Sequence, residues 1–231
     1  MKAADGHVAV MKKLLSLLFI AACMSRTGLV FAEEDSGNAE QLAQAVWKAS
    51  GGENWPNVKA IDFTFAVEKG GQTLVSAEHH WDVAAQTDHV KWKGKDVTVN
   101  LADPAADEDG KAAYARWVND SYWLIAPLKL KDRGVHVAQE ASKTMDGAEC
   151  DVLRLSFGQV GLTPNDQYRL YINPATKLVA SWDYMPEPGK SMHGTWDNYQ
   201  KSGGLTLATD HKMDGDARIR ILNLKVTAAK Y

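Results

Sequence analysis

The side chains best suited to chemistry in this 231-residue chain are its histidines and the carboxylates near them. The segment HHWD, residues 79–82, holds two of the histidines, and His193 and the pair Asp210 and His211 follow much later. Imidazole and carboxylate groups can bind a metal ion or act as general bases. A zinc site needs three or four such groups converging on one ion at about 2.0–2.2 Å. No tight ligand spacing indicates that, so the sequence predicts structural histidines, no metal and no other cofactor.

The segment around the two adjacent histidines alternates like a β-strand. Successive side chains of a strand point to opposite faces, so His79 shares a face with Trp81, whereas His80 and Asp82 share the other. The adjacent histidines therefore cannot bind one metal from one face. A hydrolase that uses His80, Asp82 or His193 is the function that the sequence favours least.

Other motifs of catalysis are incomplete. PGKS, residues 188–191, matches the end of a phosphate-binding loop, but Tyr184 stands where that loop requires glycine. Neither a G-x-S-x-G elbow nor an H-E-x-x-H helix occurs. Cys150 lies in the strand-like run AECDVLRLSF without a partner base, so we expect a small buried side chain with no chemistry. The sequence does not predict an enzyme.

The first 32 residues are typical of a secretory signal. Two lysines precede the apolar run 14–24, which is too short to span a bilayer, and VFA at 30–32 suits a signal peptidase. A second interpretation is that IAAC, residues 20–23, is a bacterial lipobox whose Cys23 is lipidated. In both cases we expect the mature chain in the periplasm, released or lipid-anchored.

Residues 33–231 are predicted to form one domain. Residues 1–32 hold four of the 26 basic residues and one of the 29 acidic ones, so the remaining 199 residues carry a net charge of −6. A mildly acidic domain without a basic cluster is a poor candidate for binding nucleic acid or an anionic membrane. No second long apolar run predicts a transmembrane span, and we expect a monomer.

The predicted elements are mostly strands. Residues 38–52 have helical spacing and end in a glycine pair. Alternation then predicts four strands between residues 61 and 101, and further short strands between residues 135 and 226. A helical insertion interrupts them. This order favours a mainly β (α+β) fold: a large curved antiparallel sheet, or incomplete β-barrel, with a covering helical lid. A two-sheet sandwich is the main structural alternative.

The predicted lid is the segment 111–130. Tyr114, Trp117, Ser121 and Leu128 fall at helical spacing and would share one side. The capping residues at 119–121 predict that this segment divides into two short helices. We expect Trp117 and Trp123 to face the concave side of the sheet and to meet Trp81 or Trp92.

Three stretches carry a family resemblance: YWLIAPLKLKDRG (122–134), DVLRLSF (151–157) and DQYRLYINPATKLVASWDY (166–184). These stretches, together with the order of predicted elements over residues 40–230, resemble the periplasmic lipoprotein-carrier (LolA-like and LolB-like) superfamily. That resemblance implies an incomplete barrel closed by helices over an apolar cavity, and a function in carrying acyl chains or lipids.

Aromatic and apolar side chains on the inward faces are the candidates for lining such a cavity. These ligand-cavity candidates are Phe63, Phe65, Trp81, Trp92, Trp117, Tyr122, Trp123, Leu155, Trp182 and Trp196. The favoured hypothesis is an exported carrier that shelters an acyl chain, lipid or lipoprotein, because apolar burial binds a chain without any polar motif. The alternative is an envelope interaction protein of the same fold, with a filled core and a protein partner.

Overall fold

The computed structural model describes residues 34–104 and 107–229. The predicted signal segment lies outside these residues, together with Cys23. Within the described ranges, no helix combines the length and the apolar character needed to cross a membrane.

The first sheet contains the four strands predicted before the helical insertion and the last strand of the chain. Its strand order is β12-β13-β1-β2-β3-β4, and every neighbouring pair is antiparallel. Its bounds are β1 Val58–Lys69, β2 Gln72–Asp82, β3 Thr87–Trp92, β4 Lys95–Asn100, β12 Asp210–Lys212 and β13 Ala217–Ala228. Gly70 and Gly71 form the predicted β1–β2 turn, where positive φ angles of 57° and 74° favour glycine.

The second sheet is a five-stranded antiparallel meander in chain order, β5 to β9. Its bounds are β5 Val135–Met145, β6 Ala148–Phe157, β7 Gln167–Ile172, β8 Val179–Glu187 and β9 Lys190–Thr195. A small hairpin of β10 Gln200–Ser202 and β11 Leu205–Leu207 is separate. Pro188 and Gly189 of the PGKS motif form the turn between β8 and β9, with Gly189 at a φ of 79°, and Lys190 and Ser191 begin β9.

The two large sheets meet along β9 and β12. Isolated antiparallel bridges join Gly194 to Met213 and Asp197 to Asp210. The strands therefore follow one another from β4 through β12 and β9 to β5 without closing into a barrel. The predicted mainly β fold with an incomplete barrel and a covering helix is confirmed.

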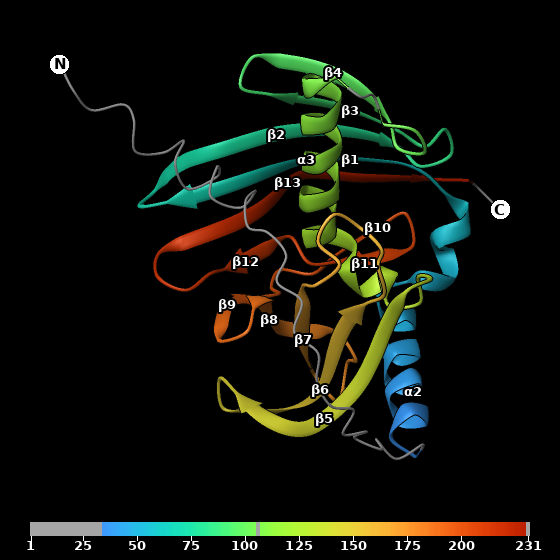
Figure 1. Ribbon diagram of the computed structural model, residues 1–231, viewed down its shortest axis with the longest axis vertical. Coiled ribbons are helices and arrows are strands. Elements are labelled where there is room, and N and C mark those ends of the chain that lie inside the picture. Colours follow the sequence, from blue (N-terminus) through green and yellow to red (C-terminus); the bar gives the residue numbers. More distant parts are fainter. Residues whose placement is uncertain (1–33, 105–106, 230–231) are drawn as a thin grey trace, which may run out of the picture. The chain divides into compact units, whose positions relative to one another are not determined.

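Helices cover this arrangement at two places. Helix α2, Glu34–Ala49, packs against β5, and the 3₁₀ helix η1, Gly52–Asn57, leads into β1. Helix α3, Glu108–Ile125, runs across the strands of the first sheet (Figure 1) and continues into η2, Ala126–Lys129.

The predicted pair of short helices is wrong, because α3 is continuous through residues 119–121. Asp120 and Ser121 are buried. The Asp120 carboxylate contacts His79 on the first sheet instead of capping a new helix. The N-cap of α3 is Asp107, whose Oδ1 accepts a hydrogen bond of 2.8 Å from the backbone N–H of Gly110.

Candidate functional site

Helix α3 divides into two parts that differ in burial. Its first part, residues 108–119, is mostly exposed or half-buried, with Ala113 and Gly110 as the buried positions. From Asp120 to Leu128 nearly every residue is buried. Helix α3 is therefore attached firmly at its C-terminal part and more loosely along its first part.

A small apolar cluster lies beneath the first part of α3. Its buried members are Ala77, Val90, Val99 and Ala113, and the half-buried side chains that pack on it are Trp92, Val97, Leu101 and Tyr114. These residues come from β2, β3, β4 and α3, together with the loop that follows β4. The buried members of this cluster (the β2–β4 cluster) are distinct from those of the main core, and Leu101 packs against both.

Nine of the ten ligand-cavity candidates lie in or against the main core. Seven are buried: Phe63, Phe65, Trp81, Trp123, Leu155, Trp182 and Trp196. Trp117 and Tyr122 are partly buried and pack on that core. Trp92 belongs instead to the β2–β4 cluster. The structure thus places all ten among the inward-facing apolar side chains.

Two groups of aromatic rings connect α3 to the two sheets. Trp117 meets Trp81 edge to face, with ring centroids 5.3 Å apart, as predicted. Trp123 does not meet Trp81 or Trp92 and instead packs on Trp182 at 4.6 Å and on His211 at 5.2 Å. Trp123 follows Trp117 by six positions, which advances the helix by roughly 9 Å and carries Trp123 to the second sheet.

The inner face of the first sheet also holds a buried ionic group that the sequence did not predict. His79 lies between Asp88 of β3 and Asp120 of α3, with its Nδ1 2.8 Å from Asp88 Oδ2 and its Nε2 3.1 Å from Asp120 Oδ2. Arg116, one turn earlier on α3, donates to Asp120 Oδ2 at 3.1 Å. We call these four residues the His79 bridge.

The inward position of His79 was available from the alternation of β2, but its partners were not. Asp88 lies nine residues away and Asp120 lies 41 residues away in the sequence. The signal that could have found this group is Asp88, an acidic residue at an inward strand position. Carboxylates are almost never fully buried unless they are paired, so a buried partner was to be expected. Asp88 faces Trp81 across the β2–β3 pair, so the register places it on that apolar face.

Several polar atoms of the aromatic groups are buried without a hydrogen-bond partner in the described part of the chain. They are Nε1 of Trp117, Trp182 and Trp196, and Nε2 of His211. His211 Nδ1 lies 2.9 Å from the carbonyl oxygen of Thr195, so Nδ1 carries the ring proton and Nε2 is an acceptor. Burial lowers the pKa of His211 to about 4, against the raising effect of that carbonyl, and keeps the ring neutral.

The other candidate catalytic residues do not assemble into one site. His80 contacts Asp62 at 2.5 Å on the exposed face of the first sheet, and His193 contacts Asp183 at 2.7 Å on the second. Asp210 binds Arg218 rather than a histidine. Within the described ranges no group of three or more histidine, cysteine or acidic side chains is placed to hold a metal.

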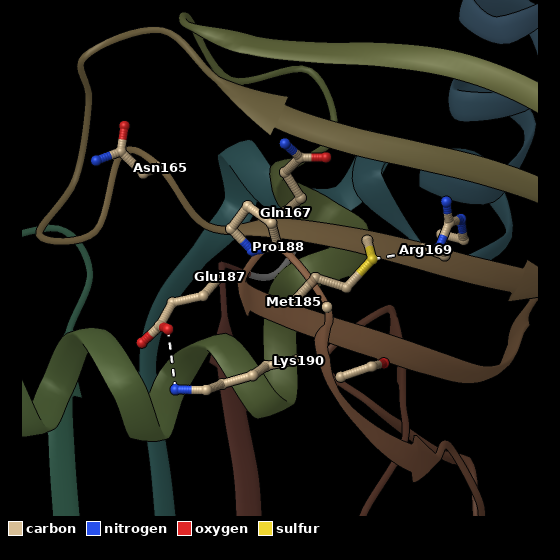
Figure 2. A pocket seen from close by; sticks show the side chains of 9 residues that line it. Asn165, Gln167, Arg169, Met185, Glu187, Pro188 and Lys190 are labelled. Atoms are coloured by element: carbon tan, nitrogen blue, oxygen red, sulfur yellow. Dashed lines mark hydrogen bonds and ion pairs between the residues drawn. The ribbon is translucent and has the colours of Figure 1, made fainter.

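Two surface pockets lie outside the β2–β4 cluster. One, of about 430 Å³, is formed around the β8–β9 turn, and Figure 2 shows Glu187 and Lys190 paired beside it. Arg169 also borders this pocket, but its Nε donates to Glu140 at 2.6 Å. The second, of about 450 Å³, includes Cys150 and Trp196 in its wall. The two basic side chains that line the first pocket, Arg169 and Lys190, are therefore both paired with carboxylates.

Comparison with known proteins gives matches among solved structures only. No protein-family model and no curated protein matches the chain. Solved structures that match are a DUF1329 family protein from Desulfovibrio piger (10% identity, 84% of this chain and 95% of that one, TM-score 0.48) and a putative outer membrane lipoprotein-sorting protein domain from Vibrio parahaemolyticus (9%, 85% and 95%, 0.49). A LolA superfamily protein from Nitrosomonas europaea also matches (10%, 81% and 94%, 0.45).

The Nitrosomonas protein carries the name of the superfamily that the sequence resembles. At 9–10% identity and TM-scores of 0.45–0.49, these matches assign no ligand, which has to be inferred from the residues of this chain.

Proposed function

We propose that this protein is an exported carrier that shelters the acyl chain of a lipid or lipoprotein beneath the first part of α3. The observation that carries the proposal is that this half-helix lies on an apolar cluster of its own, the β2–β4 cluster, apart from the main core. Lifting residues 108–119 would uncover apolar faces of three strands while the main core stays intact.

The surface uncovered in this way suits a hydrocarbon chain. Trp81 and Trp92 border it, and Val90 and Val99 form its floor. Transfer of an acyl chain onto such a surface contributes about 0.8 kcal/mol for each buried CH₂ group. A chain of ten or more carbons would therefore bind without a charged contact, which explains why the sequence carries no binding motif.

The C-terminal part of α3 would act as the attachment of the lid. Ser121, Trp123, Leu124 and Ile125 are buried, and the last three belong to the main core. A lid has to be held less firmly than the domain that it covers, because it opens for loading. The contrast between the two parts of α3 meets that requirement.

An unpaired polar atom on the first part of α3 favours a ligand that carries a polar group as well as a chain. An indole N–H buried without an acceptor costs about 1–3 kcal/mol. The N–H group of Trp117 would be satisfied by an ester, carboxyl or hydroxyl oxygen of the ligand. A water molecule would satisfy the same N–H group between ligands.

Export is part of this proposal, because lipid and lipoprotein carriers of this kind work outside the cytoplasm. We expect the mature protein in the periplasm with Glu33 as its first residue. Sequencing the N-terminus of protein from fractionated cells distinguishes the alternatives. A lipid-modified Cys23 would mean an anchored carrier, and an N-terminus at Met1 would contradict export.

Native mass spectrometry of protein purified gently from the exported fraction tests the ligand. We expect bound masses of lipid or fatty acid that organic extraction removes. Trp92→Glu should abolish them, because the charge enters the proposed site, whereas Leu74→Glu should not, because Leu74 is 55% exposed. Equal lipid content in the two variants, or none in the unmodified protein, would contradict the proposal.

A further inference from the structure

The His79 bridge connects three elements of the domain. His79 belongs to β2, Asp88 to β3, and Asp120 and Arg116 to α3. The side chains of His79 and Asp88 are completely buried, and that of Asp120 is 1% exposed. The bridge contacts α3 at the boundary between its two parts, where the half-buried first part is followed by the buried second part.

The geometry of the bridge requires an extra proton. Both ring nitrogens of His79 face carboxylate oxygens, at 2.8 Å and 3.1 Å. A neutral imidazole has only one N–H, so one of these contacts would then set two lone pairs against each other. With both nitrogens protonated, two cations, His79 and Arg116, balance the carboxylates of Asp88 and Asp120.

The surroundings of the imidazole ring supply no competing charge. Phe63 of β1 stacks on it with centroids 4.6 Å apart and planes 7° from parallel. From α3 the charged groups are Arg116 and Asp120, and the amide of Asn119 donates to Asp120 Oδ1 at 2.8 Å. From β3 the charged group is Asp88. The state of the bridge is therefore set by one proton on His79.

We propose that the His79 bridge fastens α3 to the first sheet only while it holds this proton, so that proton loss releases the first part of the helix. This inference concerns the regulation of the proposed lipid site and rests on the proposed lid function. Loss of the proton leaves two buried carboxylates opposite one guanidinium, and a buried unpaired charge is strongly unfavourable. Releasing Asp120 towards solvent relieves that charge.

The direction of the pH dependence follows from the ring's surroundings. Burial by itself lowers the pKa of His79, but the hydrogen bonds that the ring donates to Asp120 and Asp88, together with the charges of these carboxylates, outweigh burial and raise the pKa above 6.5. The fastening is thus complete below pH 6.5 and is lost as the pH rises through the raised value. The lid is closed in mildly acidic surroundings and released in more alkaline ones.

Hydrogen exchange of the ligand-free protein between pH 5.5 and 9, corrected for the intrinsic rate, tests this inference. Between pH 6.5, the ordinary pKa of a released histidine, and the raised pKa of His79 in the closed bridge, the opening constant of residues 108–120 should rise about tenfold for each pH unit, because one proton is lost on opening. Above that raised pKa the opening constant should level off. His80→Gln should keep this profile. His79→Gln should make the opening constant independent of pH.

A second variant and a spectroscopic measurement cover the case in which His79→Gln does not fold. Asp120→Asn keeps the shape of the side chain and removes its charge, so it should also flatten the profile. Nitrogen NMR at pH 6 should show both ring nitrogens of His79 protonated. An opening constant of the unmodified protein that does not change with pH, or a singly protonated His79 at pH 6, would overturn the inference.

The test of the pH-dependent bridge can be separated from the test of the proposed lipid site. Binding of dansyl-undecanoic acid at pH 6, where the bridge is closed but opens transiently, reports on the site alone. A protein that binds the probe and shows no pH-dependent opening would retain the proposed function and lose the inference. A protein with pH-dependent opening and no probe binding would retain the bridge and lose the carrier function.

Discussion

The indole rings of Trp123 and Trp182 meet edge to face with centroids 4.6 Å apart and so fix the C-terminal part of α3 on the second sheet. Trp123 is 9% exposed, and Trp182 is among the most deeply buried side chains of the described residues. The earlier turns of α3 have a different partner, since Trp117 contacts Trp81 of the first sheet while remaining half-buried.

Truncation of these two tryptophans should therefore have unequal effects. Trp123→Ala removes a core ring and should lower the free energy of unfolding by about 3–5 kcal/mol. Trp117→Ala removes a half-buried ring and should cost roughly 1–2 kcal/mol. Urea unfolding of both variants measures the difference. Equal losses would mean that the two parts of α3 are held alike.

The His79 bridge should be worth far more than the neighbouring surface pair. Asp120→Ala leaves His79 and Arg116 without a shared carboxylate in a buried place and should destabilise the protein by about 3–5 kcal/mol. Asp62→Ala, which removes the partner of exposed His80, should cost at most about 1 kcal/mol. Similar losses in equilibrium unfolding would show that the bridge contributes no more than a surface ion pair.

The two buried histidines should give stability opposite slopes with pH. His211 has a folded pKa of about 4, below 6.5, so its contribution is present above pH 6.5 and is lost as the pH falls towards 4. The loss amounts to about 3 kcal/mol. His79 has a raised pKa, so its contribution is lost as the pH rises above 6.5.

Unfolding free energies measured from pH 4 to 9 should consequently pass through a maximum near neutral pH. His211→Gln should flatten the acidic side, and His79→Gln the alkaline side. A profile of the unmodified protein that keeps rising beyond pH 8 would contradict the assignment of His79.

Cys150 should behave as a packed strand residue. Cys150 is 3% exposed on β6, and burial, together with the charges of Asp151 and Asp146, raises the pKa of its thiol. We expect a thiol reagent to react slowly with the native protein at pH 7 and rapidly in urea. Cys150→Ser should cost about 1–2 kcal/mol. Rapid labelling of the native thiol would contradict this.

The first four strands and several hairpin turns could be predicted because apolar alternation and glycine or asparagine turns are local signals. The pairing of β13 with β1 and the strands β9 and β12 were not predicted, because they lack such local signals. KSMHGT, residues 190–195, has little apolar alternation, and β12 is three residues long. Their positions depend on pairing with strands that lie elsewhere in the chain.

The candidate site was partly predictable. Inward aromatic positions followed from strand alternation and helical spacing, whereas the partners of His79 depend on the packing of α3 over β2 and β3. The same contact explains the wrong prediction of two helices. Asp120 is a good capping residue, but its carboxylate pairs with His79 and Arg116 and leaves the helical backbone uninterrupted.

Hydrogen exchange of α3 with and without oleic acid, at pH 6, tests the lid most directly. Residues 108–119 should open well below the global stability, and residues 121–128 should exchange with the slowest strands. Oleic acid at ten times its dissociation constant should slow the opening of residues 108–119 roughly tenfold. Exchange of residues 108–119 together with the slowest strands, unchanged by oleic acid, would show that the whole helix is core and would contradict the carrier function.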